Sequence, residues 1–128
     1  MLFGSGRVPE QLRAELAGEP AVLLENGLRG SVTYRDYRTP HQFSSLRKQG
    51  TYGAIAITAT RLLVWAGGRK HIDVPLSHPD RADIEISADR PDRICFAYDA
   101  GASDPTRSGR VEIRLCTAQA GHIVQLAA

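Results

Sequence analysis

Between residues 31 and 116 the chain repeats a single pattern, in which apolar and polar residues alternate along short segments that end in turn residues. Alternation with a period of two places the apolar side chains on one face of a β-strand. Seven segments are expected strands, and they span residues 31–38, 51–58, 61–66, 71–75, 83–87, 93–99 and 110–116. The segment 61–66 departs from the alternation, because it is apolar on both faces, which suits a strand that is covered on both sides. Because most of their connections are short, the sequence predicts a mostly β protein. The strands should form an antiparallel sheet that bends on itself or closes partly into a barrel.

Glycine and proline mark the expected turns. Gly67-Gly68, between two apolar segments, is a strong signal for a two-residue hairpin. Asn26-Gly27 is a second turn pair, and it ends a short apolar run over residues 21–25. The stretch 39–50 contains a proline and several polar residues, and we expect it to be a long loop or an irregular strand edge.

Two helices are expected at the ends of the chain. Residues 9–17 predict a short surface helix, with Pro9 at its first position and Gly18 at its end. After Thr117, a suitable N-cap, apolar residues recur at helical spacing over 120–127. A chain of 128 residues has the usual size of one domain. We therefore expect a single domain, with a helix and lead-in segment over 1–30 and the sheet with its closing helix over 31–128.

Seven antiparallel strands followed by a closing helix resemble the pleckstrin-homology-like superfamily. The sequence that carries the resemblance runs from Gly53 to Trp65, continues with Gly67-Gly68 and ends with residues 72–76. This stretch is similar to that of bacterial members of the superfamily and of the related GRAM-type domains. The resemblance covers residues 31–127 as an order of elements. It implies a seven-stranded bent sheet or partly open barrel closed by the C-terminal helix.

In lipid-binding members of that superfamily, basic residues at the end of the first strand and the start of the second hold phosphoinositide headgroups. The resemblance places Arg35, Arg38, Arg47 and Lys48 at the matching positions, on either side of the 39–50 stretch. The basic-x-basic pair usual on the second strand is absent, as is the tryptophan usual in the last helix. The resemblance therefore implies a fold more specifically than it implies a ligand.

The charge of the chain is nearly balanced, with a formal net charge of +2 at pH 7. That balance argues against a nucleic-acid-binding domain, which is usually strongly basic. Charge is nevertheless uneven along the chain. Residues 29–70 hold eight basic side chains and one acid, whereas residues 71–106 hold eight acids and three bases. Either the two segments pair across the sheet, which is the interpretation we favour, or they form a bipolar surface that meets a partner.

No catalytic or cofactor-binding motif appears in the sequence. It has no nucleophile elbow, no phosphate-binding glycine-rich loop and no histidine or cysteine spacing typical of metal sites, so we expect no enzymatic activity, no metal and no cofactor. His71 and Asp73 would share a strand face and could form an oriented pair, although two solvated side chains are the interpretation we favour. Trp65 and Tyr98 could line a ligand pocket, but aromatic side chains on sheet faces are usually core.

The two cysteines, Cys95 and Cys116, lie on the outward faces of their expected strands. They oppose each other if Phe96 pairs with Leu115, and they lie diagonally if Phe96 pairs with Ile113. A disulfide is possible in the first register only. We expect reduced thiols.

These observations favour a non-catalytic binding or adaptor module whose partner is a protein segment or a second copy of the chain. One alternative is peripheral attachment to an anionic membrane through Arg35, Arg38, Arg47 and Lys48. Another is a small-molecule carrier or enzyme, which requires an enclosed pocket inside the barrel. No apolar run approaches the length of a membrane span, and the first residues lack the pattern of a secretory signal. We therefore expect a cytoplasmic protein, either free or at the membrane periphery.

Overall fold

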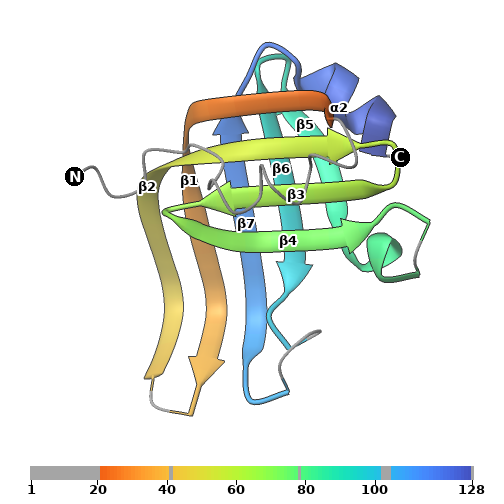
Figure 1. Ribbon diagram of the computed structural model, residues 1–128. Helices are drawn as coiled ribbons and strands as arrows, with labels where there is room; N and C mark the ends of the chain where they lie inside the picture. The colour runs from red at the N-terminus through yellow and green to blue at the C-terminus, as the bar shows by residue number, and fades with distance from the viewer. Residues whose placement is uncertain (1–20, 41, 78, 102–104, 128) are drawn as a thin grey trace.

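The computed structural model describes residues 21–40, 42–77, 79–101 and 105–127 (Figure 1). The helix expected over residues 9–17 lies outside these ranges. The protein is mostly β, with seven antiparallel strands and a C-terminal helix, as the sequence predicts. The strands are β1 (Ala21–Thr39), β2 (Gln42–Thr58), β3 (Arg61–Ala66), β4 (Arg69–Pro75), β5 (Glu85–Arg90), β6 (Arg93–Asp99) and β7 (Ser108–Cys116). The helix is α2 (Ala120–Ala127), and a short 3-10 helix, η1 (Pro79–Asp83), lies between β4 and β5.

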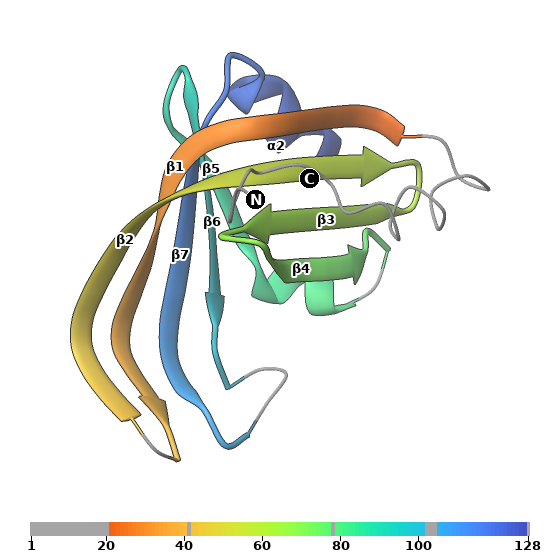
Figure 2. The same cartoon turned by 60° about the vertical axis from the view of Figure 1, so that its left-hand side comes forward.

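The sheet curls into a half-barrel with the strand order β4-β3-β2-β1-β7-β6-β5. β1 joins the two halves, because it pairs with β2 along its length and with β7 from Gly30 onward. Figure 2 shows β3 and β4 running across the direction of β6 and β7. The curl therefore gives the sheet a concave face, which holds the main core, and a convex face.

The first strand begins at Ala21, earlier than the expected start at Ser31. The prediction of a turn at Asn26-Gly27 is wrong, because this pair forms a bulge inside β1. Gly27 adopts the left-handed conformation, with φ of 64°, and β1 has one residue more than β2 at this point. Since β2 is the partner strand on both sides of the bulge, the chain continues instead of reversing.

Of the two alternatives for residues 39–50, the long loop is wrong and the strand edge is right in part, since most of this stretch is strand at the outer side of the sheet, although the strand is regular. β2 begins at Gln42, which pairs with Thr39, and the pairing with β1 then continues along the ribbon. The two strands form a long ribbon that extends beyond the end of β3 (Figures 1 and 2). Much of β2 over this stretch is exposed, so its side chains lack the apolar alternation from which strands are predicted.

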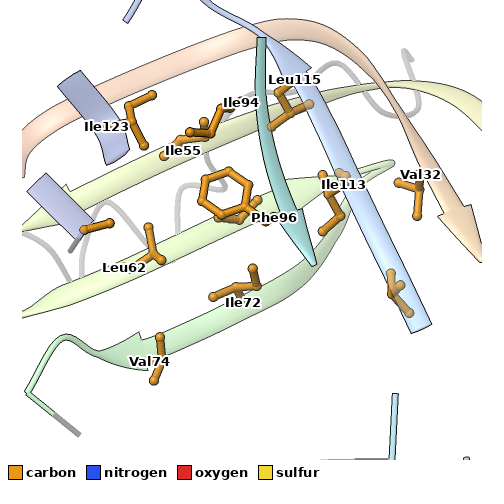
Figure 3. Packing of buried hydrophobic residues seen from close by; sticks show 14 of the residues in the cluster. Val32, Ile55, Leu62, Ile72, Val74, Ile94, Phe96, Ile113, Leu115 and Ile123 are labelled. Atoms are coloured by element: carbon orange, nitrogen blue, oxygen red, sulfur yellow. The ribbon is translucent and has the colours of Figure 1, made fainter. Parts of the chain in front are cut away.

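The core fills the concave side of the sheet, as Figure 3 shows. Phe96 is fully buried, and it lies among apolar side chains from both halves of the sheet. α2 packs against β5 and β6 and adds Ile123 to this cluster. The N-cap prediction is confirmed, because the Thr117 hydroxyl accepts a hydrogen bond of 3.1 Å from the backbone N–H of Gln119.

The hairpin predicted at Gly67-Gly68 is confirmed, with both glycines in the left-handed region that a two-residue turn requires. β3, which precedes this turn, is buried on both faces. Its convex-facing residues Leu63 and Trp65 form a second buried cluster with Ala54 and Ala56 of β2. This arrangement explains why the β3 sequence is apolar at successive positions.

The register between β6 and β7 decides the relation of the two cysteines. Phe96 pairs with Ile113, so Cys95 and Cys116 lie diagonally and both are free. Their side chains therefore do not have the direct cross-strand position that a disulfide needs.

Candidate functional site

Two adjoining hollows lie on the concave face, at the point where the β1–β2 ribbon diverges from the β3–β4 hairpin. They share Tyr34, Arg69 and His71, and their volumes are about 680 and 240 Å³. β2 contributes residues 49–52 to the larger hollow, while β6 and β7 contribute to the smaller one. We call the two hollows together the concave cleft, and its principal polar side chains are Tyr34, Tyr37, Arg69, His71, Tyr98 and Arg107.

The charge that lines the concave cleft is of one sign. Arg69, Lys70 and Arg107 line it, and its described lining includes no Asp or Glu. Lys70 lies 2.8 Å from Asp73, which offsets its charge, whereas Arg69 makes no ion pair with any carboxylate in the described ranges. A cleft lined by charge of one sign raises the local concentration of counter-ions. The concave cleft is therefore suited to an anion.

Three tyrosines add hydroxyl groups to this surface. Tyr34 and Tyr37 form an edge-to-face pair, with ring centres 4.9 Å apart. They lie close together because Asp36 has a positive φ of 49° and β1 is irregular there against β7. The Arg107 guanidinium donates a hydrogen bond of 3.2 Å to the Tyr37 hydroxyl. The Tyr37 hydroxyl thus contacts a cation in the lining of the smaller hollow.

His71 occupies an irregular position in β4. The register of β3 and β4 shifts between Val64 and Trp65, which leaves His71 outside the regular pairing. Its Nδ1 lies 2.8 Å from the Tyr98 hydroxyl. Burial, together with the charge of Arg69, lowers the pKa of His71 to about 4, and burial raises the pKa of Tyr98 to about 12. Both groups are neutral at pH 7, so their contact is a neutral hydrogen bond.

The pairing of His71 with Asp73, left open by the sequence, does not occur. Asp73 accepts hydrogen bonds of 2.8 Å from Arg61 and from Lys70, and it is exposed. The prediction that His71 and Asp73 share a strand face is wrong, because the register shift breaks the alternation on which it depends.

Arg47 approaches the cleft from β2. Its guanidinium lies 4.5 Å from the centre of the Tyr34 ring, a cation–π distance. Its Nε is buried, and no described atom accepts a hydrogen bond from it. A buried donor without an acceptor costs about 1–3 kcal/mol, so such a group calls for an explanation. The cation–π contact with Tyr34 is the interaction that the structure shows for this guanidinium.

The four site residues suggested by the resemblance do not gather on one surface. Arg47 lies on the concave side, whereas Lys48 pairs with Thr33 and faces the convex side. Arg35 is also on the convex side, where its Nε lies 2.9 Å from Glu112. Arg38 lies near the end of the ribbon, 5.0 Å from the Phe43 ring centre. Of the four, only Arg47 lies on the concave side, where it contacts Tyr34, and none of the four lines either hollow.

Comparisons with models of known protein families, with curated proteins and with solved structures find no match to this chain. The chemistry of the concave cleft is therefore the basis on which a function can be assigned.

Sequence reasoning missed most of the cleft. Tyr98 was considered as a pocket residue and does line the cleft, while Trp65 belongs to the convex cluster. Arg69 carries one sequence signal, since it follows the Gly67-Gly68 turn directly and hairpin ends are exposed. Tyr34, Tyr37 and Arg107 carry none, because strand pairing brings them together.

The cleft offers binding groups but few reactive ones. Two of its acid–base candidates, His71 and Tyr98, are hydrogen-bonded to each other. Within the described ranges, no three His, Cys, Asp or Glu side chains gather in a way that could hold a metal ion. No helix in the described part of the chain is long and apolar enough to cross a membrane.

Proposed function

We propose that the protein is a non-catalytic binding module of pleckstrin-homology-like type, and that it holds an anionic group in the concave cleft. The curled seven-stranded sheet and the closing helix support the proposed type, together with the resemblance of residues 53–76. The observation that supports the ligand is the lining of the cleft, which combines arginines and tyrosine hydroxyls with no described carboxylate.

The ligand class follows from the groups in the cleft. Arginine guanidinium groups bind carboxylate and phosphate oxygens through charge-assisted hydrogen bonds. Arg69 lines both hollows and makes no ion pair with a described carboxylate, so its guanidinium can donate to a ligand. Tyr34, which lines both hollows together with Arg69, adds a hydroxyl group. A phosphate or carboxylate group attached to a larger molecule fits this set.

The carrier alternative is not part of the proposal. It requires open space inside the half-barrel, yet apolar side chains fill that space with at most 1% of their surface exposed, among them Ile55, Ile57, Val64, Ile94, Phe96 and Ile113. The concave cleft lies beside this packed cluster and not within it.

An NMR titration with inorganic pyrophosphate tests the proposal. We expect amide shifts in residues 49–52 and around Arg69, and we expect them to weaken at higher salt. The variant Arg69→Glu should lose the response. Arg90→Glu, which makes the same charge change at an exposed position on β5, should keep it. Shifts scattered over the convex face, or an equal loss in both variants, would count against the cleft as the site.

A second candidate function is attachment to an anionic membrane by the end of the β1–β2 ribbon. Phe43 and Leu46 are large apolar side chains that are 56% and 62% exposed, and Arg38 and Lys48 are exposed on the same ribbon. Apolar side chains next to cations suit a membrane interface.

Co-sedimentation with vesicles separates the two candidates. We would compare phosphatidylserine-containing vesicles with pure phosphatidylcholine vesicles, at low and physiological salt. If the ribbon end binds the membrane, Phe43→Ser combined with Leu46→Ser abolishes salt-sensitive binding, whereas Arg69→Glu leaves most of it. No binding at either salt would remove the membrane candidate and leave soluble anionic ligands.

A further inference from the structure

The outer half of β2 is an open sheet edge. β3 pairs with β2 only over residues 53–57, while β2 itself begins at Gln42. Over the part of β2 that precedes Gly53, the described structure provides a neighbouring strand on the β1 side alone. Figure 1 shows this half of β2 as the outermost strand of the ribbon. We call residues 44–52 of β2 the open edge.

The backbone of the open edge has hydrogen-bonding groups that point away from β1. The carbonyl of Tyr52 accepts a hydrogen bond of 3.0 Å from the Gly67 N–H, on the side of β3. Because backbone direction alternates with a period of two along a strand, the N–H and C=O groups of Gly50, Lys48 and Leu46 point the same way. No described residue pairs with them, and all three residues are exposed. Such a row of groups can pair with an added strand.

Charge identifies what kind of strand fits. β2 contains no acidic residue from end to end, and its open edge carries Arg47 and Lys48. A second copy of the chain pairing with itself here would bring these cations close to their own counterparts, which is unfavourable. A strand with acidic side chains would meet opposite charge instead. The occupant favoured by the charge is therefore an acidic segment of another protein.

The two faces of such a strand would meet different surroundings. Side chains on its concave side would lie beside Arg47 and beside Gln49, which lines the larger hollow together with Arg69. Side chains on its convex side would lie beside the exposed Leu46 and Tyr52. A segment that alternates acidic and apolar residues satisfies both faces.

We propose that the open edge of β2 binds an extended acidic peptide segment of a partner protein by adding it as a strand to the sheet. This inference rests on the proposed binding function, because the acidic side chains of the peptide would occupy the same cleft. It adds the class of partner and the way in which the partner backbone is held.

A capped peptide that alternates glutamate and valine is a direct probe. We expect it to bind the intact chain, and to slow amide hydrogen exchange at Leu46, Lys48 and Gly50. A lysine–valine peptide of equal length should not bind. Equal binding of both peptides would overturn the charge argument.

Gly50 offers a matched pair of variants. Its N–H points away from β1, and a Cβ added there meets nothing within 4 Å. Gly50→Pro removes the donor from the edge without touching the β1 pairing, whereas Gly50→Ala keeps it. We expect Gly50→Pro to weaken peptide binding by about tenfold or more, and Gly50→Ala to change it little. If Gly50→Pro does not fold, a peptide N-methylated on the amides that face β2 tests strand addition with the unchanged chain. It removes the complementary hydrogen bonds, from the peptide N–H groups to the β2 carbonyls, and it should bind at least about tenfold more weakly.

The outcomes distinguish this inference from the proposed function. Strand addition is overturned if Gly50→Pro binds the peptide as tightly as the unchanged chain does, the N-methylated peptide binds equally well, and the amide shifts are confined to the cleft. The cleft would then still bind anions. A chain dimer that Gly50→Pro dissociates means that a second copy occupies the edge, which also overturns the proposal. Binding to phosphatidylserine vesicles that outcompetes the peptide assigns the surface to lipid. Pyrophosphate binding by Gly50→Pro shows that the cleft itself remains intact.

Discussion

The guanidinium of Arg47 lies 4.5 Å from the centre of the Tyr34 ring, and the two residues are direct cross-strand neighbours on β2 and β1. This contact links the exposed ribbon to the concave cleft, because Tyr34 lines both of its hollows. It also places a cation beside a residue of the cleft, on a strand that contains no acid. The proposed anion binding and the open edge of β2 therefore both involve the β1–β2 ribbon.

Removing the Arg47 charge should affect binding more than stability. Arg47→Met loses a cation–π contact of about 0.5–1 kcal/mol, but it also removes a buried donor that has no described acceptor. We expect the free energy of unfolding in urea to change by less than about 1 kcal/mol, and pyrophosphate binding to weaken severalfold. Lys48→Met is the control, since Lys48 faces the convex side. Equal loss of binding in both variants would contradict a site in the cleft.

His71 should make stability depend on pH in mildly acidic solution. Its pKa is about 4 in the folded chain because of burial and Arg69, against 6.5 when it is unperturbed. Protons therefore bind the unfolded chain more tightly, and the free energy of unfolding falls as the pH drops from 6.5 towards 4, by up to about 3 kcal/mol. His71→Gln should remove this slope in chemical denaturation between pH 6.5 and 5. His122→Gln, at an exposed position of α2, should retain it.

Glu112 holds together the convex face of the sheet. Its carboxylate lies 2.9 Å from Arg35 and Arg110 and 3.3 Å from Arg114. Although burial alone would raise the pKa of Glu112, hydrogen bonds from Arg110 and Arg35 and the neighbouring charges lower it to about 2. This stabilisation is complete above pH 4.5 and is lost as the pH falls towards 2.

Glu112→Gln should therefore lower the free energy of unfolding at pH 7 by about 1–3 kcal/mol. Glu85→Gln is the comparison, because Glu85 pairs with Arg110 at a position where its side chain is 66% exposed. We expect a change within about 0.5 kcal/mol for that variant. A similar effect of the two substitutions would show that burial of Glu112 is unimportant.

Two glycines of β2 should respond in opposite ways to alanine. A Cβ on Gly53 would lie 2.4 Å from the carbonyl oxygen of Trp65 and 2.7 Å from Leu115, whereas a Cβ on Gly50 meets nothing. Gly53→Ala should destabilise the chain by about 1–3 kcal/mol in thermal or urea unfolding, because β2 and β3 must move apart. Gly50→Ala should be neutral or slightly stabilising. A neutral Gly53→Ala would mean that these strands are less closely packed.

The two thiols should differ in reactivity. Cys116 is exposed, whereas burial raises the pKa of Cys95 and shields it. With a disulfide reagent such as dithionitrobenzoate at neutral pH, we expect one fast thiol and one slow thiol, both becoming fast in denaturant. Cys116→Ser should remove the fast phase. Two fast thiols in the native protein would contradict the burial of Cys95.

Much of the fold was predictable because its signals are local. Alternating apolar residues predict strands such as β6, and two glycines, which accept a positive φ, predict the turn at Gly67-Gly68. The helix α2 is predicted by its N-cap, Thr117, and by the helical spacing of its apolar residues. Each signal depends on neighbours within a few positions of the chain, so it can be recognised without knowing what the chain packs against.

The outer part of β2 and the bulge at Asn26-Gly27 could not be predicted in this way. Both depend on the partner strand: hydrogen bonds to β1 keep polar residues extended, and continuous pairing with β2 turns an apparent chain reversal into a bulge. Tertiary pairing thus overrides the local preference for a loop or a turn.

The candidate site was decided almost wholly by tertiary structure. The basic residues near the expected loop were accessible to sequence reasoning, but the two faces of the ribbon separate Arg47 from Arg35 and Lys48. The candidate site is instead the concave cleft, which brings together Tyr34, Arg69 and Tyr98 from three different strands. Composition and local pattern predict the strands and the core, because each strand must bury its own apolar side chains whichever strand it pairs with. Only register and curl decide which polar side chains meet across the sheet, since one extra residue in a strand moves a side chain to the other face.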